Sequence, residues 1–541
     1  MRQSRGFLFA ALFIVLLETS YMPYASAFPG DDPQKPAIFK TQATLVQVPA
    51  VITDKNGKHI HGLTKGDFQI LEDGTEQKIT VFEEIHTSDA PPKAFVNQPN
   101  AFTNLIFSGD PQCVLSLVVF DAINTAFMDQ QAGRLALIKY LNDHPNSKPS
   151  MGLMLMTDNG IKKLSGMTDD TAALIKTLEN LKGETPATEA FAVSPQRFSS
   201  SPERLRLEKE AEITEATNRQ EQAIDRTMRS FLAIALSLSG VPGRKSLIWA
   251  TGSFPFYLDS MKSEPENPRL AQLYERTMEA LNDAQISVYP VDVRGLASNA
   301  TVDSKSNAAK DILEKTMAQT RLLDSTLHNL QSFADLTGGR AFYNRNDLDS
   351  GFRDAVEDSS SYYLLGYYRN TQNMKPGWRK LQVKLQREDA EIRAREGFYV
   401  GHATLDPAST QQADETFALM SPFDSTGIPL MVRWNGEALT SGKTPEFAML
   451  VPASNVIETT DAHRVNLDFI WEASRNGASV LKDGHSLKGN VNEPALEKLK
   501  RDGVYYKNSL KLPRGDYQVK FVVRDNLSGR IGSVTTPLTV P

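Results

Sequence analysis

Cysteine is almost absent from this sequence: Cys113 is the only one in 541 residues. No disulfide can therefore form within the chain, and a disulfide-stapled scaffold is excluded. Cys113 begins an apolar run, and its neighbours favour a small core residue over a reactive nucleophile. A chain of this length must instead be stabilised by burying apolar side chains, and the length predicts three or four domains.

Long apolar runs and an excess of basic residues are also lacking. After the N-terminus, no segment reaches the roughly 18 apolar residues that a membrane helix needs. The formal net charge is −6, which excludes the basic footprint of a nucleic-acid-binding protein. Residues 1–27 combine Arg2 and Arg5, an apolar run and Ala25-Ser26-Ala27. This layout predicts a cleaved signal peptide and an exported, periplasmic or secreted protein, with an uncleaved N-terminal anchor as the alternative.

Catalytic signatures are missing as well. The sequence has no Gly-x-Ser-x-Gly, no His-Glu-x-x-His and no phosphate-binding glycine loop, and its eight histidines are scattered. We therefore expect no enzyme activity, although catalytic groups can also be assembled in space from distant residues. His59 and His61 place two imidazoles on one side of a strand, but no third metal ligand is near them in the sequence. They are interpreted as solvated histidines at the edge of a turn.

The most informative stretch is an apolar run, Cys113–Phe120, that ends at Asp121. It predicts a strand that is buried on both faces, and strand and helix patterns alternate from there to about residue 358. The predicted strands are Val114–Phe120, Gly152–Met156, Lys245–Ala250, Ile286–Val291 and Arg340–Tyr343, and the predicted helices are Gln131–Asp143, Thr171–Leu181, Leu270–Ala284 and Leu322–Leu336. This alternation predicts an α/β fold with a doubly wound, mostly parallel sheet.

Further segments are expected to flank this sheet. Residues 38–90 contain two hairpin signals, Asn56-Gly57 and Asp73-Gly74, and predict a small N-terminal β module, followed by a linker. After residue 358 the apolar period changes to two, which predicts a β extension over 359–401 and a C-terminal β-sandwich over 414–541. Gly338-Gly339 is a helix C-cap signal.

A long charged helix is predicted near residues 200–239, where it interrupts the strand and helix pattern. Ser201-Pro202-Glu203 resembles a helix start. The first half of the segment is polar and the second half is apolar, so we expect its C-terminal end to pack on the sheet and its N-terminal end to project. The projecting end is either a solvated face or a partner-binding arm.

Several ordered blocks resemble one protein family. They are Val118–Thr125, Pro242–Trp249, Ala284–Gly295, Ala334–Ala341 and Tyr362–Tyr367, preceded by Gly62–Phe68. Together they resemble the von Willebrand factor type A domain, and more narrowly the exported VWFA-related proteins of acidobacteria. The resemblance implies that residues 112–358 form a von Willebrand A-like domain.

The resemblance also implies a metal-ion-dependent adhesion site, in which carboxylate and hydroxyl oxygens hold Mg²⁺ and leave a position for a partner. Asp121 and Thr125 match the first loop of the family pattern, but Ile123 replaces its middle hydroxyl residue. The implied ligand set is Asp121, Asn124, Thr125, Thr185 and Thr251. Because Thr251 stands where the family has an acid, Mg²⁺ is expected to bind weakly or not at all. Asp121 could equally cap its own loop or the following helix.

These observations predict an exported, non-catalytic module for protein binding or cell adhesion. It would use the loops at the carboxyl edge of the sheet, where ligands bind in open parallel sheets, and a degenerate metal site. A protein partner is expected. The alternatives are an extracytoplasmic hydrolase and a scaffold protein of the cell envelope.

Overall fold

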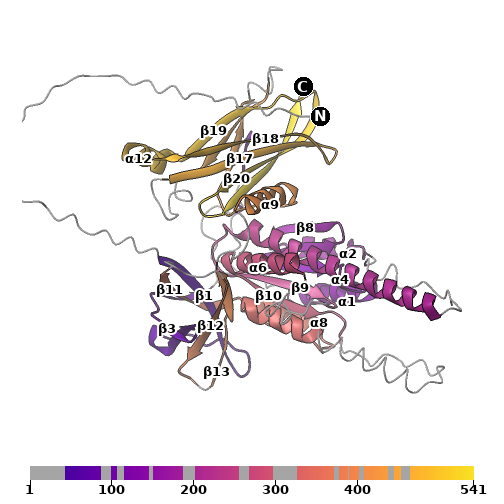
Figure 1. Cartoon of the computed structure of the whole chain (residues 1–541). Helices are drawn as coiled ribbons and strands as arrows, with labels where there is room; N and C mark the ends of the chain where they lie inside the picture. Colours follow the sequence, from indigo (N-terminus) through magenta and orange to yellow (C-terminus); the bar gives the residue numbers. More distant parts are fainter. Residues whose placement is uncertain are drawn as a thin grey trace, which may run out of the picture. The chain divides into compact units, whose positions relative to one another are not determined.

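A computed structural model describes most of the chain. The described residues are 43–86, 99–106, 115–144, 150–184, 186, 202–254, 267–295, 326–370, 377–387, 389–400, 407–436, 444–452 and 464–541, and Figure 1 shows their helices and strands. They belong to one compact unit, Gln42–Pro541. The predicted signal peptide, Cys113 and Thr185 lie outside the described residues. Among the described helices, none is both long and apolar enough to cross a membrane.

One sheet mixes parallel and antiparallel strands. It contains β6 (Leu115–Asp121), β7 (Ser150–Thr157), β8 (Gly160–Thr168), β9 (Lys245–Thr251) and β10 (Ile286–Asp292), in the order β10-β9-β6-β7-β8. The first three pairs in this order are parallel, and β8 runs antiparallel to β7. Every residue of β6, β7, β9 and β10 is buried. This burial explains why these strands are nearly continuous apolar runs in the sequence.

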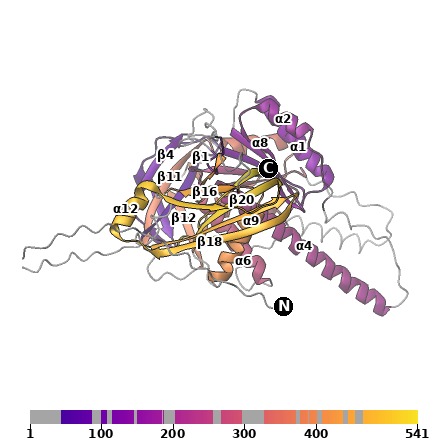
Figure 2. The same cartoon turned by 90° about the horizontal axis from the view of Figure 1, so that it is seen from above.

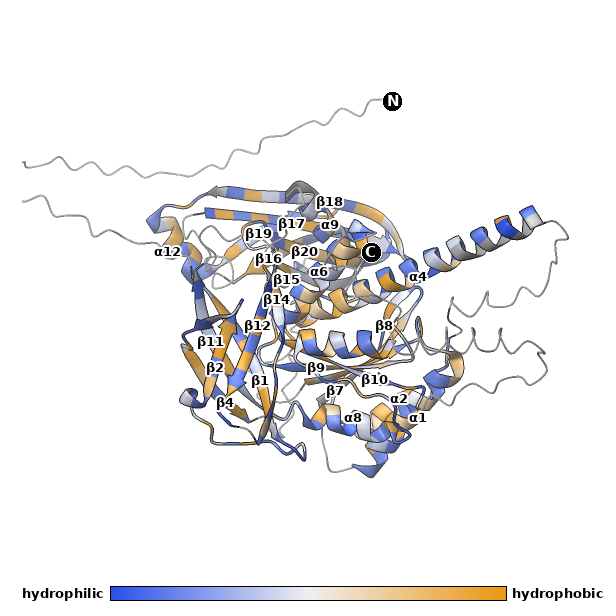
Figure 3. Ribbon diagram, turned by 60° about the horizontal axis from the view of Figure 1, so that its bottom comes forward, coloured by the Kyte–Doolittle hydropathy of each residue, from blue (hydrophilic) through white to orange (hydrophobic). Residues whose placement is uncertain are grey.

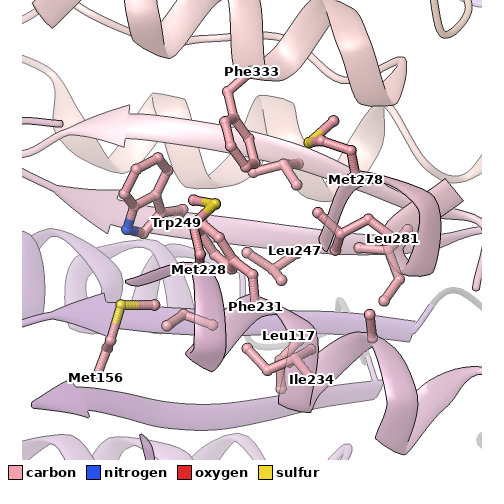
Figure 4. Close-up of a cluster of buried hydrophobic side chains, with 14 of the residues drawn as sticks. Leu117, Met156, Met228, Phe231, Ile234, Leu247, Trp249, Met278, Leu281 and Phe333 are labelled. Carbon is pink, nitrogen blue, oxygen red and sulfur yellow. The ribbon is translucent and has the colours of Figure 1, made fainter. Parts of the chain in front are cut away.

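Helices cover both faces of this sheet. The helical segments are α1 (Phe127–Asp143), α2 (Thr171–Glu179), α4 (Pro202–Leu238), α6 (Pro268–Asp283), residues 326–337 and α8 (Leu348–Glu357). Successive side chains of β6 point to opposite faces: Val119 packs with α4, α6 and residues 326–337, whereas Val118 packs with α1, α2 and α8. Figure 4 shows the first of these layers, in which Phe231 and Phe333 lie 5.0 and 5.9 Å from the Trp249 ring.

Two antiparallel sheets are each built from strands that precede the mixed sheet in the sequence and strands that follow it. Their strands are β1 (Ala43–Asp54), β2 (Phe68–Glu72), β3 (Thr75–Gln77), β4 (Val81–His86), β11 (Ser361–Asn370), β12 (Gly377–Leu385), β13 (Ala390–Arg393) and β14 (Gly397–Val400), and the 3₁₀ helix η1 (Lys65–Asp67) precedes β2. The orders are β13-β1-β11-β4 and β14-β12-β2-β3. The N-terminal β module and the 359–401 extension, predicted as separate segments, are therefore interleaved in the same sheets and share one core.

The C-terminal region forms two more antiparallel sheets. Their elements are β5 (Ala101–Thr103), α9 (Pro407–Met420), β15 (Met431–Trp434), β16 (Glu446–Val451), β17 (Arg464–Arg475), β18 (Ala478–Asn490), α12 (Glu493–Asp502), β19 (Val504–Ser509), β20 (Gly515–Asp525) and β21 (Ile531–Val540). The orders are β19-β16-β15-β5 and β18-β17-β20-β21, and both sheets contribute to one core around Trp434, Phe447 and Trp471. One local prediction was wrong, because the linker expected after the N-terminal β module contains β5. Helix α9 begins before residue 414, where the sandwich was expected to start.

The predicted fold class, an α/β protein with a doubly wound, mostly parallel sheet, is wrong. Four of the five sheets in the described part of the chain are antiparallel throughout, and the fifth is mixed. One cause is a two-residue turn, Asp158-Asn159, which returns the chain from β7 to β8. Gly160 ends that turn with φ +100°, a conformation that glycine adopts readily. The other cause is long-range pairing of β1 and β2 with β11 and β12, which no local pattern reveals.

Candidate functional site

Four of the five predicted site residues meet at the carboxyl ends of β6 and β9. Asp121 is the last residue of β6, and Thr251 is the last residue of β9. Asn124 and Thr125 lie in the loop that leads to α1. Asp121, Thr125 and Thr251 are almost completely buried. The loop residues therefore face one another inside the protein more than they face solvent.

The Asp121 carboxylate is the centre of this cluster. Oδ1 accepts hydrogen bonds from the backbone N–H groups of Ile123 and Asn124, both at 2.9 Å. Oδ2 accepts from Asn124 Nδ2 at 2.9 Å, Trp249 Nε1 at 3.1 Å and Thr251 Oγ1 at 2.8 Å. A carboxylate offers about four acceptor positions, so these five donors occupy both oxygens. Mg²⁺ could bind Asp121 only by displacing some of them.

Burial and hydrogen bonding act on Asp121 in opposite directions. Removal from water disfavours the charged form and raises the pKa of Asp121 above its usual range, while the donors from Asn124, Thr251 and Ile123 act to lower it. Both effects follow from the use of this carboxylate as a buried acceptor that joins the end of β6 to β9. This is the loop-capping role that the sequence left open as an alternative to metal binding.

The other predicted ligands are also engaged within the protein. Thr125 Oγ1 accepts from the Gly252 N–H at 2.8 Å, and Ser253 Oγ donates to the Asn124 carbonyl at 3.0 Å. Gln130 bridges the first loop to the second, because Nε2 donates to the carbonyls of Thr125 and Glu184, both at 2.8 Å. The structure thus brings the residue before Thr185 beside the predicted site.

An ion pair that was not expected from the sequence lies at the carboxyl end of β10. Asp292, the last residue of β10, pairs side by side with Thr251 of β9. Its carboxylate accepts from Arg294 Nε at 2.9 Å and from Arg294 Nη2 at 2.7 Å. The spacing Asp-x-Arg at a strand end is a weak sequence signal, since only the fold shows that the two side chains turn toward each other.

Helix α4 passes this edge of the sheet and continues beyond it. Asn124 Nδ2 donates to Thr227 Oγ1 at 2.9 Å, and Arg226 pairs with Asp158 in the β7–β8 turn. From Arg226 toward its N-terminus, the helix continues to Pro202. The described side chains of its first part, Pro202–Asn218, are all exposed: Glu203, Arg206, Leu207, Glu210, Ala211, Thr214, Glu215, Ala216, Thr217 and Asn218. We call this part the α4 arm.

The α4 arm projects from the same edge that carries the loops. About 17 residues at about 1.5 Å each give a length of about 25 Å. Figures 1 and 2 show α4 extending from the mixed sheet in both views, and Figure 3 shows that its apolar residues are concentrated in the half near the sheet. The predicted helix near residues 200–239, with a buried C-terminal half and an exposed N-terminal half, is confirmed.

The two histidines noted in the sequence acquire neighbours from a distant strand. The rings of His59 and His61 stack at 6.3 Å, but His59 Nε2 is directed at the Glu357 carbonyl, 3.1 Å away. His61 instead contacts Glu84 and His86 of β4. No third ligand stands near His61 in the sequence because Glu84 and His86 are more than twenty positions away, and only sheet formation brings them together.

A buried lysine lies at the opposite end of β9. Lys245 is 2% exposed, and its Nζ donates to the carbonyls of Val241 at 2.5 Å and Gly243 at 2.7 Å. Burial lowers the pKa of Lys245 from its usual 10.5 to about 7. Between these two pH values the unfolded chain binds one proton more than the folded chain, so unfolding takes up a proton. Raising the pH from 7 toward 10.5 therefore stabilises the fold.

Lys245→Met is expected to remove this pH dependence. Relative to the variant, the unfolding free energy of the unmodified protein should rise by about 1 kcal/mol per pH unit between about pH 8 and 10, close to the limit for one proton. Urea unfolding at several pH values measures this difference. Lys488→Met, at an exposed position of β18, is the control. Parallel pH profiles for the unmodified protein and Lys245→Met would contradict the expectation.

Comparison with known proteins identifies no family. No protein-family model matches the chain, and no curated protein matches it. Among solved structures, the three N-terminal domains of the type V pili tip protein Mfa5 from Porphyromonas gingivalis are similar over 66% of this chain and 75% of that chain, at 8% sequence identity and a TM-score of 0.24. A likeness this small assigns neither a fold nor a function.

Proposed function

We propose that this protein is an exported, non-catalytic binding module for another protein, and that the α4 arm is its principal contact surface. The observation that carries the proposal is the exposure of every described side chain from Glu203 to Asn218 in a helix whose other half is buried. The neighbouring loops at the ends of β6 and β9 would form the base of the same surface.

The energetics of the arm support a role in binding. A solvated helix of this length is marginal by itself in water, because ordering its backbone costs conformational entropy that burial does not offset. Here the helix is continuous with the buried turns around Phe231, and Arg206 and Glu210 form an i,i+4 ion pair of 3.6 Å. Exposed Leu207 adds an apolar contact for a partner. The arm therefore presents a pre-ordered surface at little further entropic cost.

The loop chemistry favours binding that does not depend on Mg²⁺. The five donors to Asp121 fill the carboxylate that an adhesion-type site would use. Thr125 and Thr251 are likewise engaged with Gly252 and Asp121. A partner would then be recognised through the arm and the outer surface of the loops, by apolar and charged contacts, rather than through a shared ion.

Photo-crosslinking in the exporting cell tests this proposal. A photoreactive phenylalanine analogue replaces Leu207 in the arm or, as the matched control, Tyr505 in β19; the two native side chains are 55% and 57% exposed. We expect a discrete adduct with another protein from the Leu207 position and none from the Tyr505 position. Equal adducts at both positions, no adduct at either, or an adduct containing only a second copy of this chain would contradict the proposal.

A further inference from the structure

Three side chains in the N-terminal sheets converge as a group of metal-ligating type. Glu84 and His86 are alternate residues of β4 and therefore share one face of that strand. His61 approaches them from the segment between β1 and β2. Glu84 Oε1 lies 3.0 Å from His61 Nδ1 and 3.2 Å from His86 Nε2, and the two imidazole rings are 4.9 Å apart.

The spacing of these atoms suits a small divalent ion. Zn²⁺ binds histidine nitrogen and carboxylate oxygen at about 2.0–2.2 Å, and a tetrahedral arrangement then separates neighbouring ligand atoms by about 3.4 Å. The two contacts to Glu84 Oε1 are within a few tenths of an ångström of this value, and one ligand atom from each of the three residues lies within 4.8 Å of the others. Imidazole and carboxylate together match the preference of Zn²⁺ rather than that of Mg²⁺ or Ca²⁺.

The surrounding hydrogen bonds hold the group in position. Tyr363 is the residue opposite Glu84 in the pairing of β11 with β4. Its hydroxyl donates to the Ile60 carbonyl at 3.0 Å and accepts from the Leu63 N–H at 3.1 Å. The Gly62 N–H donates to Glu84 Oε2 at 3.1 Å. The backbone on both sides of His61 is thus fixed to β4, which carries the other two residues, and to its neighbour β11, as is typical of the shell that orients metal ligands.

The contacts within the group all meet at one carboxylate oxygen. Glu84 Oε1 is the nearest partner of both His61 Nδ1 and His86 Nε2. Without an ion, both imidazoles would have to donate N–H groups to the same carboxylate oxygen. A cation between the three side chains removes that requirement and supplies the positive charge directly.

The group is accessible to solvent, which leaves room for a fourth ligand. The side chains of His61 and His86 are 50% and 59% exposed, so water can reach an ion bound between them. Three protein ligands with an accessible position are typical of a zinc ion that binds water or an exogenous ligand, whereas purely structural zinc sites have four protein ligands.

We propose that His61, Glu84 and His86 form a Zn²⁺ site whose fourth position is open to solvent. The site lies in the N-terminal sheets, and it depends neither on the α4 arm nor on the Asp121 loop. Its failure and the failure of the proposed binding function are therefore independent results.

Isothermal titration of ZnCl₂ into the chelator-treated full-length mature chain, in a buffer that does not bind zinc, tests the site. We expect one ion per chain for the unmodified protein. Because even an outer-shell partner commonly accounts for about tenfold in metal affinity, His61→Ala, His86→Ala and Glu84→Gln should each weaken binding by at least about tenfold. His485→Ala removes an exposed histidine from β18 and should leave the affinity unchanged.

Two further measurements make the result decisive. Circular dichroism melting of each variant shows that lost binding does not reflect lost folding, and His61→Ala and His86→Ala, at side chains 50% and 59% exposed, are the variants expected to perturb the fold least. Co²⁺ absorption reports tetrahedral coordination and should disappear with His86→Ala. Absence of Zn²⁺ binding to the unmodified protein, undiminished binding in His61→Ala and His86→Ala, or an equal loss in His485→Ala would overturn the proposal.

Discussion

Replacing Asp121 with alanine is expected to lower the free energy of unfolding by about 4 kcal/mol. The substitution removes the acceptor of five donors, of which the Ile123 N–H and the Trp249 Nε1–H are buried. The Thr251 hydroxyl can turn to the Ser253 carbonyl, 3.0 Å away. Each buried donor left unsatisfied costs about 1–3 kcal/mol, and water entering the vacated space recovers part of the total. Denaturant unfolding of the two proteins measures the difference.

Two companion variants sharpen this experiment. Asp143→Ala removes an exposed carboxylate at the end of α1, 3.5 Å from Lys139, and should change the unfolding free energy by no more than about 0.5 kcal/mol. Asp121→Asn keeps one acceptor oxygen but directs an amide N–H at some of the donors, so an intermediate loss of about 2 kcal/mol is expected. A loss below about 1 kcal/mol in Asp121→Ala would contradict the described network.

The same variants test the metal question. Because the donors occupy both oxygens of Asp121, millimolar Mg²⁺ should leave the melting temperature of the unmodified protein unchanged. A stabilisation by Mg²⁺ that disappears in Asp121→Asn would show instead that the ion displaces the donors and that the loop works as an adhesion-type site.

Gly339→Ala is expected to lower the free energy of unfolding by an amount similar to that for Asp121→Ala, because the added methyl group would clash with the backbone of β10. Residues 326–337 end at Gly338, which has φ +75°, and Gly339 N–H returns to the Ala334 carbonyl at 2.9 Å. A Cβ on Gly339 would lie 1.9 Å from the Val288 carbonyl oxygen in the central part of β10. Because backbone of a buried strand cannot move aside easily, we expect a loss of at least about 3 kcal/mol.

Thermal and denaturant unfolding of Gly339→Ala measure this loss, with soluble yield as a second readout if the variant does not fold. Gly489→Ala on β18 is the matched control, because a Cβ there meets no atom within 4 Å. The control should differ from the unmodified protein by no more than about 0.5 kcal/mol. An equal, small effect in both variants would mean that the segment after residue 337 does not pack against β10 as described.

Local elements could be predicted because neighbouring residues determine them. The strand that ends at Asp121 is recognisable from the apolar run Cys113–Phe120, and β6 covers Leu115–Asp121. The long helix is recognisable from its charged first half and apolar second half, and α4 covers Pro202–Leu238. Gly338-Gly339 signals a helix end because only glycine adopts positive φ without strain, and the structure has a turn there.

The fold class could not be predicted from the same information. The hydrophobic pattern of β1 is satisfied by any apolar partner, and its actual partners, β11 and β13, come more than three hundred residues later. The short turn after Thr157 reversed one strand of the central sheet. Strand direction depends on connections and on competing partners, neither of which is encoded in a window of a few residues.

The features of the candidate sites likewise fall into two groups, those that local sequence predicts and those that depend on tertiary contacts. The sequence by itself determined that Asp121 ends a buried strand beside polar loop residues, and that a long amphipathic helix interrupts the sheet region, because burial and periodicity leave a local signature. Only the tertiary structure decided that Trp249 and Thr251 use up the Asp121 carboxylate, and that His61 meets Glu84 and His86. These contacts join residues that are distant in sequence, and they arise only when the strands pair and the loops close on one another.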